Sequence, residues 1–507
     1  MKRIVFLLMI LTILTKSVGF GREIILSYYY GATGISDAYL ISFTIPTVIF
    51  TFIGVGIQTT YMPIYSDILN KDGIKIANEF TNNVANLLLI ISSILIIAVS
   101  LFTEPIVKIF ASGFTGETLN LAVSFTRIGI FSIYFIGLLY IFQGYLQLKN
   151  NFFIPALIGL PLNFFLIISI ILSYKLDIKI LGYGTILGAI AQLVFILPFL
   201  YKNDYRHKFK LNICDKNLKR MIYLALPVIL GTSVNQINML VDITIASSVA
   251  VGGISALNYA YILITFIQGI FVMSLATVLF ATISKLAAEG NLIGLKKSVT
   301  EVINVINLLI IPATVGAMIF AEPVVKLLFD RGVFDSQAVS MTSYALFFYS
   351  IGMIGFGLRE VLARAFYSLQ DTKTPMLNAA IGMILNIILN IILSKFLGIG
   401  GIALATSISA IFTACLMFIS LRKKIGPFGM KQISISLVKI LFASMVMGAF
   451  AKLSFNYLTY TLSQNLSLII AMGVGAVIYF IIICYMKIDD VEVIINAIKR
   501  KKKNNVA

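Results

Sequence analysis

The residues with the clearest capacity for chemistry are charges set inside an apolar stretch near the N-terminus. Residues 16–37 read KSVGFGREIILSYYYGATGISD, with Lys16 and Arg22 six positions apart. On a helix this spacing separates two side chains by about 9 Å along the axis and about 120° around it. Gly19 and Gly21 lie between them, and a bend there would aim both cations at one elongated anion. Lysine supplies a point charge and arginine a bidentate donor, so the pair predicts a phosphate-bearing ligand.

Nearby acidic residues offer a structural alternative for the second cation. Glu23 follows Arg22 directly, and adjacent side chains on a helix project about 100° apart, so this pair is not expected to meet. Asp37, at the start of the next apolar run, could instead pair with Arg22 and fasten two helices together. The sequence leaves the ligand-binding and the structural interpretations of Arg22 open.

A second group of polar residues is neutral or acidic. Asn386 and Asn390 are four residues apart and share one helix face, and the same half of the chain contains Thr406 and Asp242. Carboxylate, amide and hydroxyl oxygens are hard ligands that suit Na⁺. Asparagines inside apolar helices also tie helices together by hydrogen bonds, and the spacing alone favours this second interpretation.

Further charges occur in later apolar runs. Arg359, Glu360 and Arg364 share one run, whereas Arg127 and Lys439 lie near the ends of theirs and are expected to extend toward the membrane surface. A charge inside a membrane span costs about 2.5–3.5 kcal/mol on insertion scales. The interior charges are therefore expected to face a cavity or a partner.

The composition identifies the elements that must position these residues. The chain has 507 residues, of which 59% are hydrophobic and 12% charged, so it is an integral membrane protein. Its apolar runs are continuous over about 20 residues, which indicates helices rather than a barrel. The single histidine, His207, and three scattered cysteines, Cys214, Cys415 and Cys484, argue against histidine catalysis, a disulfide framework and a metal cluster.

The apolar runs predict fourteen transmembrane helices in an all-α polytopic protein. The predicted spans are 5–26, 38–63, 81–102, 121–146, 152–174, 180–200, 221–247, 254–281, 299–320, 338–367, 375–396, 400–421, 434–456 and 464–486. The connecting loops are short and hold few catalytic side chains, so we expect a transporter rather than an enzyme.

The net charge of +18 follows the membrane topology. Most Lys and Arg residues fall in loops on the side of both termini, and the positive-inside rule then places both termini in the cytoplasm. The tail KRKKK (499–503) is explained by this topology and by anionic lipid, and we expect no nucleic acid partner. Lys2 and Arg3 before an apolar stretch also fit a signal peptide, whose cleavage would leave an odd number of spans.

The chain repeats itself at an offset near 220 residues. EPIVKIF (104–110) returns as EPVVKLLF (322–329), and ATGISDAY (32–39) is echoed by VGGISALN (251–258). Each half has six spans, so the two halves share one orientation, as in transporters built from parallel repeats. The predicted domains are an N-terminal lobe (1–200), a basic linker (201–220), a C-terminal lobe (221–421), two added helices (434–486) and a basic tail (487–507).

Several motifs resemble one family. VGFGREIILSYYYGATGISDAYLISFTIP (18–46), LPVILGTSVNQINMLVD (226–242), LLFDRGVFD (327–335) and VLARAFYSLQDTKTPMLNAAIGMILNIILN (361–390) are similar to sequences of the MurJ/MviN family of lipid II flippases. This family belongs to the multidrug/oligosaccharidyl-lipid/polysaccharide exporter superfamily. The resemblance covers nearly the whole chain, including the two added helices.

The resemblance implies two six-helix lobes around a central cavity, with the last two helices forming a groove for a lipid tail. It implies a bacterial cytoplasmic membrane protein, expected to be a monomer, that moves lipid II to the outer leaflet by alternating access. The family's substrate-binding positions fall on Lys16, Arg22, Glu23 and Asp37, to which Arg359 and Arg364 are added as further candidates. The resemblance implies no cofactor other than Na⁺. The implied Na⁺ site consists of Asp242, Asn386, Asn390, Thr406 and the carbonyl of Ile402.

Two departures from the family pattern keep alternatives open. The stretch PTVIFTFIGVGIQTTYMP (46–63) lacks the arginine pair of many relatives, and Tyr261-Ile262 stands where Asp-Arg is common. The remaining cations then carry more of the diphosphate, or the cargo is another polyprenyl-diphosphate-linked glycan. A drug/cation antiporter of the same superfamily is the more distant alternative, expected to have acidic residues where Lys16 and Arg22 stand.

Overall fold

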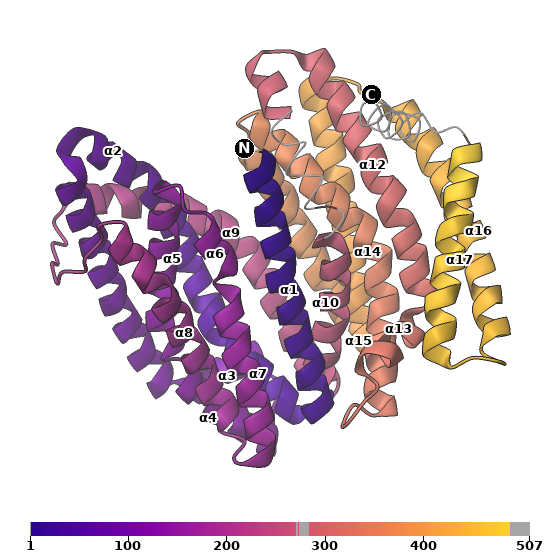
Figure 1. Ribbon diagram of the computed structural model, residues 1–507, viewed down its shortest axis with the longest axis horizontal. Helices are drawn as coiled ribbons and strands as arrows, with labels where there is room; N and C mark the ends of the chain where they lie inside the picture. The colour runs from indigo at the N-terminus through magenta and orange to yellow at the C-terminus, as the bar shows by residue number, and fades with distance from the viewer. Residues whose placement is uncertain (1, 270–271, 273–282, 487–507) are drawn as a thin grey trace, which may run out of the picture. The chain divides into compact units, whose positions relative to one another are not determined.

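A computed structural model describes residues 2–269, 272 and 283–486, and within them all regular secondary structure is helical (Figure 1). The predicted basic tail and part of the predicted span 254–281 lie outside these residues. The helices are α1 (Lys2–Tyr30), α2 (Gly34–Leu101), α3 (Thr103–Phe110), α4 (Gly116–Gly129), α5 (Ser132–Leu148), α6 (Phe153–Leu157), α7 (Gly159–Lys175), α8 (Ile180–Lys202), α9 (Lys216–Val249), α10 (Gly253–Gln268), α12 (Leu292–Ile319), α13 (Ala321–Phe329), α14 (Ser336–Ser368), α15 (Lys373–Ile425), α16 (Met430–Leu458) and α17 (Gln464–Tyr485).

Two helices are far longer than a membrane crossing requires, and each breaks at a glycine. α2 has 68 residues and is interrupted at Gly73, where φ is 80°. α15 has 53 residues and is interrupted at Gly398, where φ is 54°. Positive φ values are readily adopted only by glycine. Each break falls between two predicted spans, so α2 and α15 each supply a pair of spans.

The described helices support a polytopic membrane protein. Eight of them are long and apolar enough to cross a membrane, or nine if the pair α4–α5, bent by 49°, forms one span. The remaining predicted spans fall on other described helices or include residues that the structure does not describe. The predicted number of fourteen is consistent with this set.

The chain divides into two compact units. Unit 1 comprises Met1–Ala256 with Arg331–Ala338, and unit 2 comprises Leu257–Asp330 with Val339–Ala507. α9 belongs to unit 1 because it packs along α2, and a β-carbon at Gly56 would touch Ile229 and Ala225 of α9. The predicted lobes instead place α9 in the C-terminal half, and their boundaries stay a prediction.

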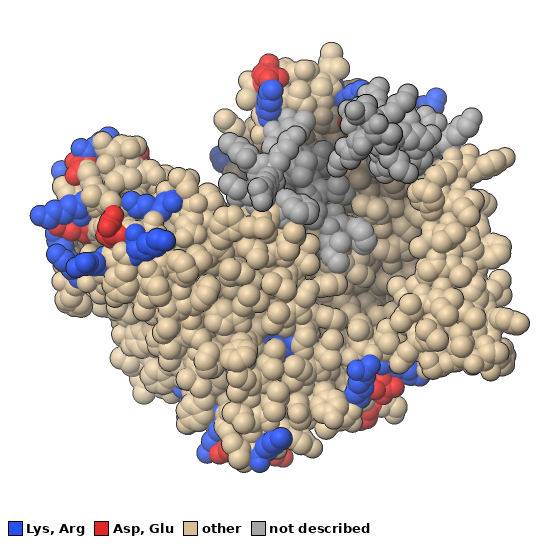
Figure 2. Space-filling view, viewed as in Figure 1, with Lys and Arg blue, Asp and Glu red and all other residues tan. Residues whose placement is uncertain are grey.

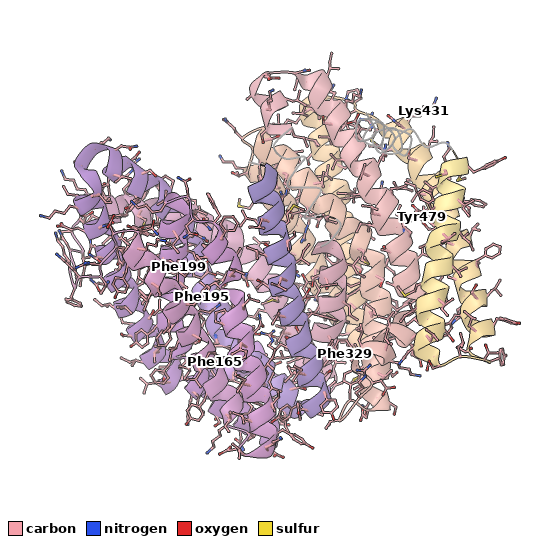
Figure 3. All side chains as sticks on the ribbon, viewed as in Figure 1. Phe165, Phe195, Phe199, Phe329, Lys431 and Tyr479 are labelled. Atoms are coloured by element: carbon pink, nitrogen blue, oxygen red, sulfur yellow. The ribbon has the colours of Figure 1, made fainter. Side chains whose placement is uncertain are left out.

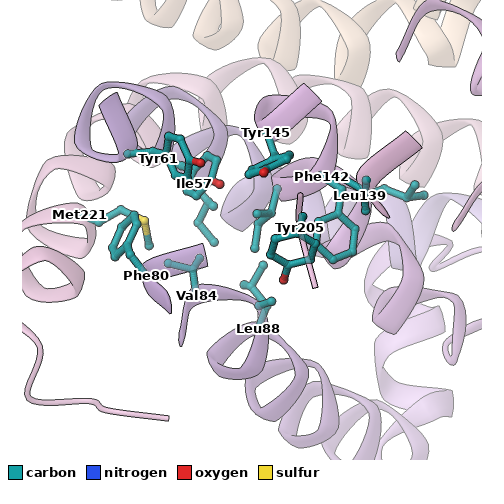
Figure 4. Close-up of a cluster of buried hydrophobic side chains, with 14 of the residues drawn as sticks. Ile57, Tyr61, Phe80, Val84, Leu88, Leu139, Phe142, Tyr145, Tyr205 and Met221 are labelled. Atoms are coloured by element: carbon teal, nitrogen blue, oxygen red, sulfur yellow. The ribbon is translucent and has the colours of Figure 1, made fainter. Parts of the chain in front are cut away.

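Unit 1 contains a cluster of buried hydrophobic side chains, several of them aromatic (Figure 4). The rings of Tyr61 and Phe80 stack at 6.0 Å, and Tyr205 lies 5.3 Å from Tyr145 and 5.4 Å from Phe142. Large aromatic surfaces bury much area, and tyrosine also needs a hydrogen-bond partner when buried. Tyr61 meets this need with Thr81, at 2.7 Å. The cluster fixes the break in α2 against α5.

In unit 2, α16 and α17 pack against each other and α16 packs along α12. The Tyr479 hydroxyl of α17, labelled in Figure 3, donates to the Leu308 carbonyl of α12 at 2.7 Å. Lys439 donates to the carbonyl of Met486 at 3.1 Å, so its charge lies at the C-terminal end of α17. A cation is favourable there because helix carbonyls carry partial negative charge.

The repeat predicted from the sequence is visible in two short helices. α3 carries EPIVKIF and α13 carries EPVVKLLF, and each follows the end of a long helix directly. Each also holds a surface ion pair between residues four apart, Glu104–Lys108 and Glu322–Lys326. The two sequence echoes therefore adopt the same local structure.

Candidate functional site

Repeat-related segments meet within unit 1. Ser36 and Ser255 occupy equivalent positions of the two echoes, and their hydroxyls are hydrogen-bonded at 2.9 Å. Two glycine contacts are related in the same way. A β-carbon at Gly113 would lie 2.2 Å from the Ser247 carbonyl, and one at Gly332 would lie 2.2 Å from the Tyr28 carbonyl. The two glycines are offset by 219 residues and so are their two partners, so the two contacts join equivalent positions of the repeats.

Asp37 binds the start of α10. One carboxylate oxygen accepts from the backbone N–H of Gly252 at 2.8 Å, and the other accepts from the N–H and hydroxyl of Ser255 at 2.8 and 2.6 Å. The side chain is buried, and a carboxylate is favoured at a helix N-terminus. The equivalent residue of the second repeat is Ala256, so one carboxylate serves this junction. The predicted contact of Asp37 with substrate stays a prediction.

Arg22 and Glu23 form an ion pair, contrary to the expectation that they would not meet. The Arg22 Nε donates to Glu23 at 3.1 Å, and a terminal nitrogen makes a second contact. The expectation was wrong because it followed β-carbon directions, whereas the long arginine folds around the helix. The guanidinium also lies 5.5 Å from the Phe43 ring, which holds it against α2. Arg22 is thus partly neutralised and directed by its neighbours.

Lys16 has a different environment. It lies in the middle of α1 and is exposed, and it makes no hydrogen bond or ion pair with any residue that the structure describes. α1 is one uninterrupted helix through Gly19 and Gly21. Lys16 and Arg22 therefore keep the separation of a regular helix, about 9 Å along the axis. An elongated ligand could contact both, whereas one small ion could not.

The other two predicted substrate-binding cations belong to α14 of unit 2. Arg364 pairs with Glu360, one turn earlier, at 3.0 Å, and the Arg359 guanidinium lies 5.9 Å from the Phe356 ring. Both cations are thus in contact with their own helix. Their role in substrate binding stays a prediction.

Residues of the predicted sodium site form a hydrogen-bonded chain inside unit 2. Asn390 donates to Asn386 at 2.8 Å, Asn386 donates to Thr406 at 3.2 Å, and Thr406 donates to the Ile402 carbonyl at 3.0 Å. Asn386 and Asn390 are fully buried. The chain links the two parts of α15 across the break at Gly398. This geometry matches the helix-tying interpretation.

The same geometry bears on Na⁺ binding. The oxygens of Asn386, Thr406 and Ile402 that would bind the ion each accept one of these hydrogen bonds, and each has a second lone pair. Asp242, the predicted carboxylate ligand, lies on α9 in unit 1. Within the described residues, no group of three or more His, Cys, Asp or Glu side chains has the arrangement of a metal site.

Sequence reasoning missed several partners of the predicted residues. The α10 N-terminus that binds Asp37 is distant in sequence, although the echo of 32–39 in 251–258 pointed to it. Phe43 gave no signal, since aromatic residues are frequent throughout the chain.

Comparison with known proteins places the chain in a family. The sequence model described as "Lipid II flippase MurJ" matches residues 26–475. The "Probable lipid II flippase MurJ" of Buchnera aphidicola subsp. Baizongia pistaciae is 30% identical over 409 residues, 80% of each chain. That of Thermotoga maritima is 28% identical over 485 residues, 96% of each chain.

Solved structures agree with this assignment. The structure described as "Lipid II flippase MurJ, inward closed conformation" aligns with a TM-score of 0.83 and 27% identity, covering 96% of this chain and all of that one. An inward-facing multidrug resistance transporter of the MATE family and MOP superfamily aligns with a TM-score of 0.68 at 17% identity, which shows a shared fold. The match over most of its length shows that this chain belongs to the MurJ family of lipid II flippases.

Proposed function

We propose that this chain is a flippase that moves a polyprenyl-diphosphate-linked peptidoglycan precursor, lipid II, from the cytoplasmic to the outer leaflet. The observation that carries the proposal is Lys16, an exposed cation in the middle of α1 and of the predicted span 5–26, without a partner among the described residues. Such a charge is costly in lipid and is stabilised by water or an anion, so it supports an aqueous cavity that receives an anionic headgroup.

In this proposal Lys16 and Arg22, at two positions along α1, both bind the diphosphate. Lys16 provides an exposed charge, and Arg22 provides a guanidinium that Glu23 and Phe43 hold in place. Binding of the anion favours one orientation of the two repeats, and release follows their rearrangement to the opposite side, as alternating access requires. The polyprenyl tail stays in lipid, for which the exposed apolar side chains of α16 and α17 are suited.

The test is complementation in a bacterium depleted of its resident lipid II flippase. The wild-type chain should restore growth and the outer-leaflet appearance of lipid II, while Lys16→Gln should restore both much more weakly at equal membrane abundance. Lys108→Gln is the matched control, because it removes a lysine that is exposed and paired with Glu104. Failure of the wild-type chain despite correct insertion would overturn lipid II as the cargo.

A second candidate cargo is another polyprenyl-diphosphate-linked glycan. The absence of any charge in 46–63 supports it, because many relatives carry arginines there. Growth restored by the chain in a mutant lacking a different glycan flippase, but not in the lipid II-depleted strain, would favour this alternative. Lys16→Gln should lower activity in either strain, because both cargoes carry a diphosphate.

We propose that both termini face the cytoplasm, on the basis of the distribution of Lys and Arg. Cys214 is exposed in the loop between α8 and α9 and can report the orientation. With Cys415 and Cys484 replaced by serine, a membrane-impermeant maleimide should label inverted vesicles and leave intact spheroplasts unlabelled. Labelling of the spheroplasts would reverse the proposed orientation.

A further inference from the structure

The loop between α8 and α9, residues 203–215 and here called the strap, is held against α2 and is extended over residues 206–212. Three asparagines of α2 bind its backbone. Asn82 accepts from the N–H of Lys208, Asn86 donates to the carbonyls of Lys208 and Lys210, and Asn83 both donates to and accepts from the backbone of Asn212, at distances between 2.7 and 3.2 Å.

The hydrogen bonds reveal the conformation of the strap. They fall on residues 208, 210 and 212, so every second residue turns its backbone toward α2, as in a β-strand. Side chains of an extended segment alternate between two faces. Arg206, Lys208 and Lys210 therefore lie on one face and Phe209 lies on the other, and Ile213 lies in the turn that follows the extended residues. The strap is an amphipathic extended segment.

An aromatic anchor fixes the strap at its beginning. Tyr205 is buried in the cluster of Figure 4, and its hydroxyl donates to Asn82 at 2.8 Å. At the other end, Asp215 caps α9 by accepting from the N–H groups of Asn217 and Leu218. Because both ends and the backbone are bound, the side chains between them are presented in a defined arrangement.

The presented side chains combine apolar and basic character. Phe209 is 84% exposed and Ile213 is 61% exposed, which is unfavourable in water for side chains of this size. Arg206 and Lys208 are exposed on the opposite face, where Lys210 pairs with Glu79 at 2.5 Å. Figure 2 shows Lys and Arg gathered, with some Asp and Glu, over this end of unit 1.

We infer that the strap is a binding site for anionic phospholipid headgroups of the leaflet that adjoins it, the cytoplasmic leaflet in the orientation proposed above. The strap follows directly from α8, an apolar helix long enough to cross a membrane, so it begins at the level of the headgroups. Phe209 and Ile213 enter the boundary between headgroups and acyl chains, and Arg206 and Lys208 contact lipid phosphates. The asparagines of α2 hold the strap in the orientation that this binding requires.

The chain contains no tryptophan, which makes a direct test available. Phe209→Trp introduces a single indole fluorophore into the full chain, which is then reconstituted in nanodiscs containing phosphatidylcholine and phosphatidylglycerol. Brominated lipids quench an indole that touches them. The Phe209→Trp variant should be quenched strongly, as should Ile213→Trp, whereas Lys208→Trp on the opposite face should be quenched much less.

The charge preference is tested in the same discs by brominating one lipid at a time. Brominated phosphatidylglycerol should quench the fluorescence of the Phe209→Trp variant more than brominated phosphatidylcholine does at equal mole fraction. Added salt should reduce this difference in quenching. Adding Arg206→Gln and Lys208→Gln to this variant should lower the ratio of the two lipid affinities by roughly tenfold. The matched control, Arg422→Gln with Lys423→Gln, removes two exposed cations of α15 and should leave the ratio unchanged.

Two results would overturn the inference. Equal quenching of the Lys208→Trp and Phe209→Trp variants would show that the two faces of the strap do not differ toward the membrane. A Phe209→Trp variant that is unquenched in nanodiscs but shielded from aqueous quenchers in native membranes would indicate a protein partner in place of lipid.

Discussion

The polar residues of α1 and those of α15 lie in similarly apolar helices, yet they differ in the hydrogen-bond partners that the protein gives them. Asn386 and Asn390 are fully buried and hydrogen-bonded in a chain with Thr406. Lys16 is exposed and has no hydrogen-bond or ion-pair partner among the residues that the structure describes. Buried polar groups that satisfy each other hold helices together, whereas a charge that the protein does not neutralise is available to a ligand.

Arg22 and Asp37 lie between these extremes. Arg22 has an ion pair but retains some exposure, with 18% of its side chain accessible, so a ligand can still reach it. Asp37 is buried, and three hydrogen bonds bind its carboxylate to α10. The comparison therefore distinguishes residues available to bind a ligand from residues that stabilise the fold. Each substitution below tests the assignment of one residue.

The largest effect is expected for Lys16. Lys16→Gln should lower lipid-linked cargo translocation by roughly 10- to 100-fold, since a hydrogen bond to a charged group contributes about 1.5–3 kcal/mol. Its thermal unfolding temperature should stay within about 2 °C of wild type, because no described protein partner is lost. Translocation is measured in proteoliposomes and unfolding in detergent. A loss of stability as large as that of the buried variants below would place Lys16 with the structural residues.

Asp37→Ala should have the largest effect on stability. It leaves the N–H groups of Gly252 and Ser255 without their acceptor in a buried junction, which costs about 2–4 kcal/mol. The measurement is thermal unfolding of the purified variant, with Asp37→Asn as a control that retains one acceptor oxygen and loses less. Unchanged stability of Asp37→Ala, combined with lost translocation, would instead favour the predicted contact with substrate.

Asn390→Leu should cost roughly 0.6–2 kcal/mol, since it removes the donor to Asn386 from the hydrogen-bonded chain in α15. The same variant tests the predicted Na⁺ site. If these hydrogen-bonded side chains only hold the two parts of α15 together, the wild-type protein should unfold at the same temperature in NaCl as in KCl. The same should hold for the variant. Stabilisation of wild type by Na⁺ over K⁺, lost in Asn390→Leu and in Asp242→Asn, would identify the group as an ion site.

The sequence predicted the helices well because membrane spans depend on the length of an apolar run. Predicted spans 38–63 and 81–102 both fall on α2, and the break at Gly73 lies between them. The repeat predicted the likeness of α3 and α13, whose EP motifs adopt the same short helix. These features are local, and the physical rules that govern them act within about 20 residues.

The details of the site were harder to predict because they depend on contacts distant in sequence. Side-chain direction on an ideal helix separated Arg22 from Glu23, but the reach of the guanidinium brings them together. The asparagines of TNNVAN (81–86) are polar in a predicted span, and their target, the backbone of residues 208–212, lies far along the chain. Such pairings become visible only when the helices are placed in space.

The smallest effect on stability is expected for Asp371, a carboxylate outside the membrane spans that is paired within the protein. Asp371 precedes α15, where Lys424 donates to it at 2.5 Å and Thr374 donates from its N–H and hydroxyl. These contacts, chiefly the one with Lys424, lower the pKa of Asp371 from 3.8 to about 2.

Because the folded pKa of Asp371 is the lower one, its stabilisation is present above about pH 4 and is lost as the pH falls toward 2. Lys424 is 39% exposed and solvent screens the pair, so we expect no more than about 1 kcal/mol. Asp371→Asn should reduce the fall in unfolding free energy between pH 4 and pH 2 and change cargo translocation little at neutral pH. A translocation defect as large as that of Lys16→Gln would contradict the comparison, because a charge satisfied by the protein would then be needed for function.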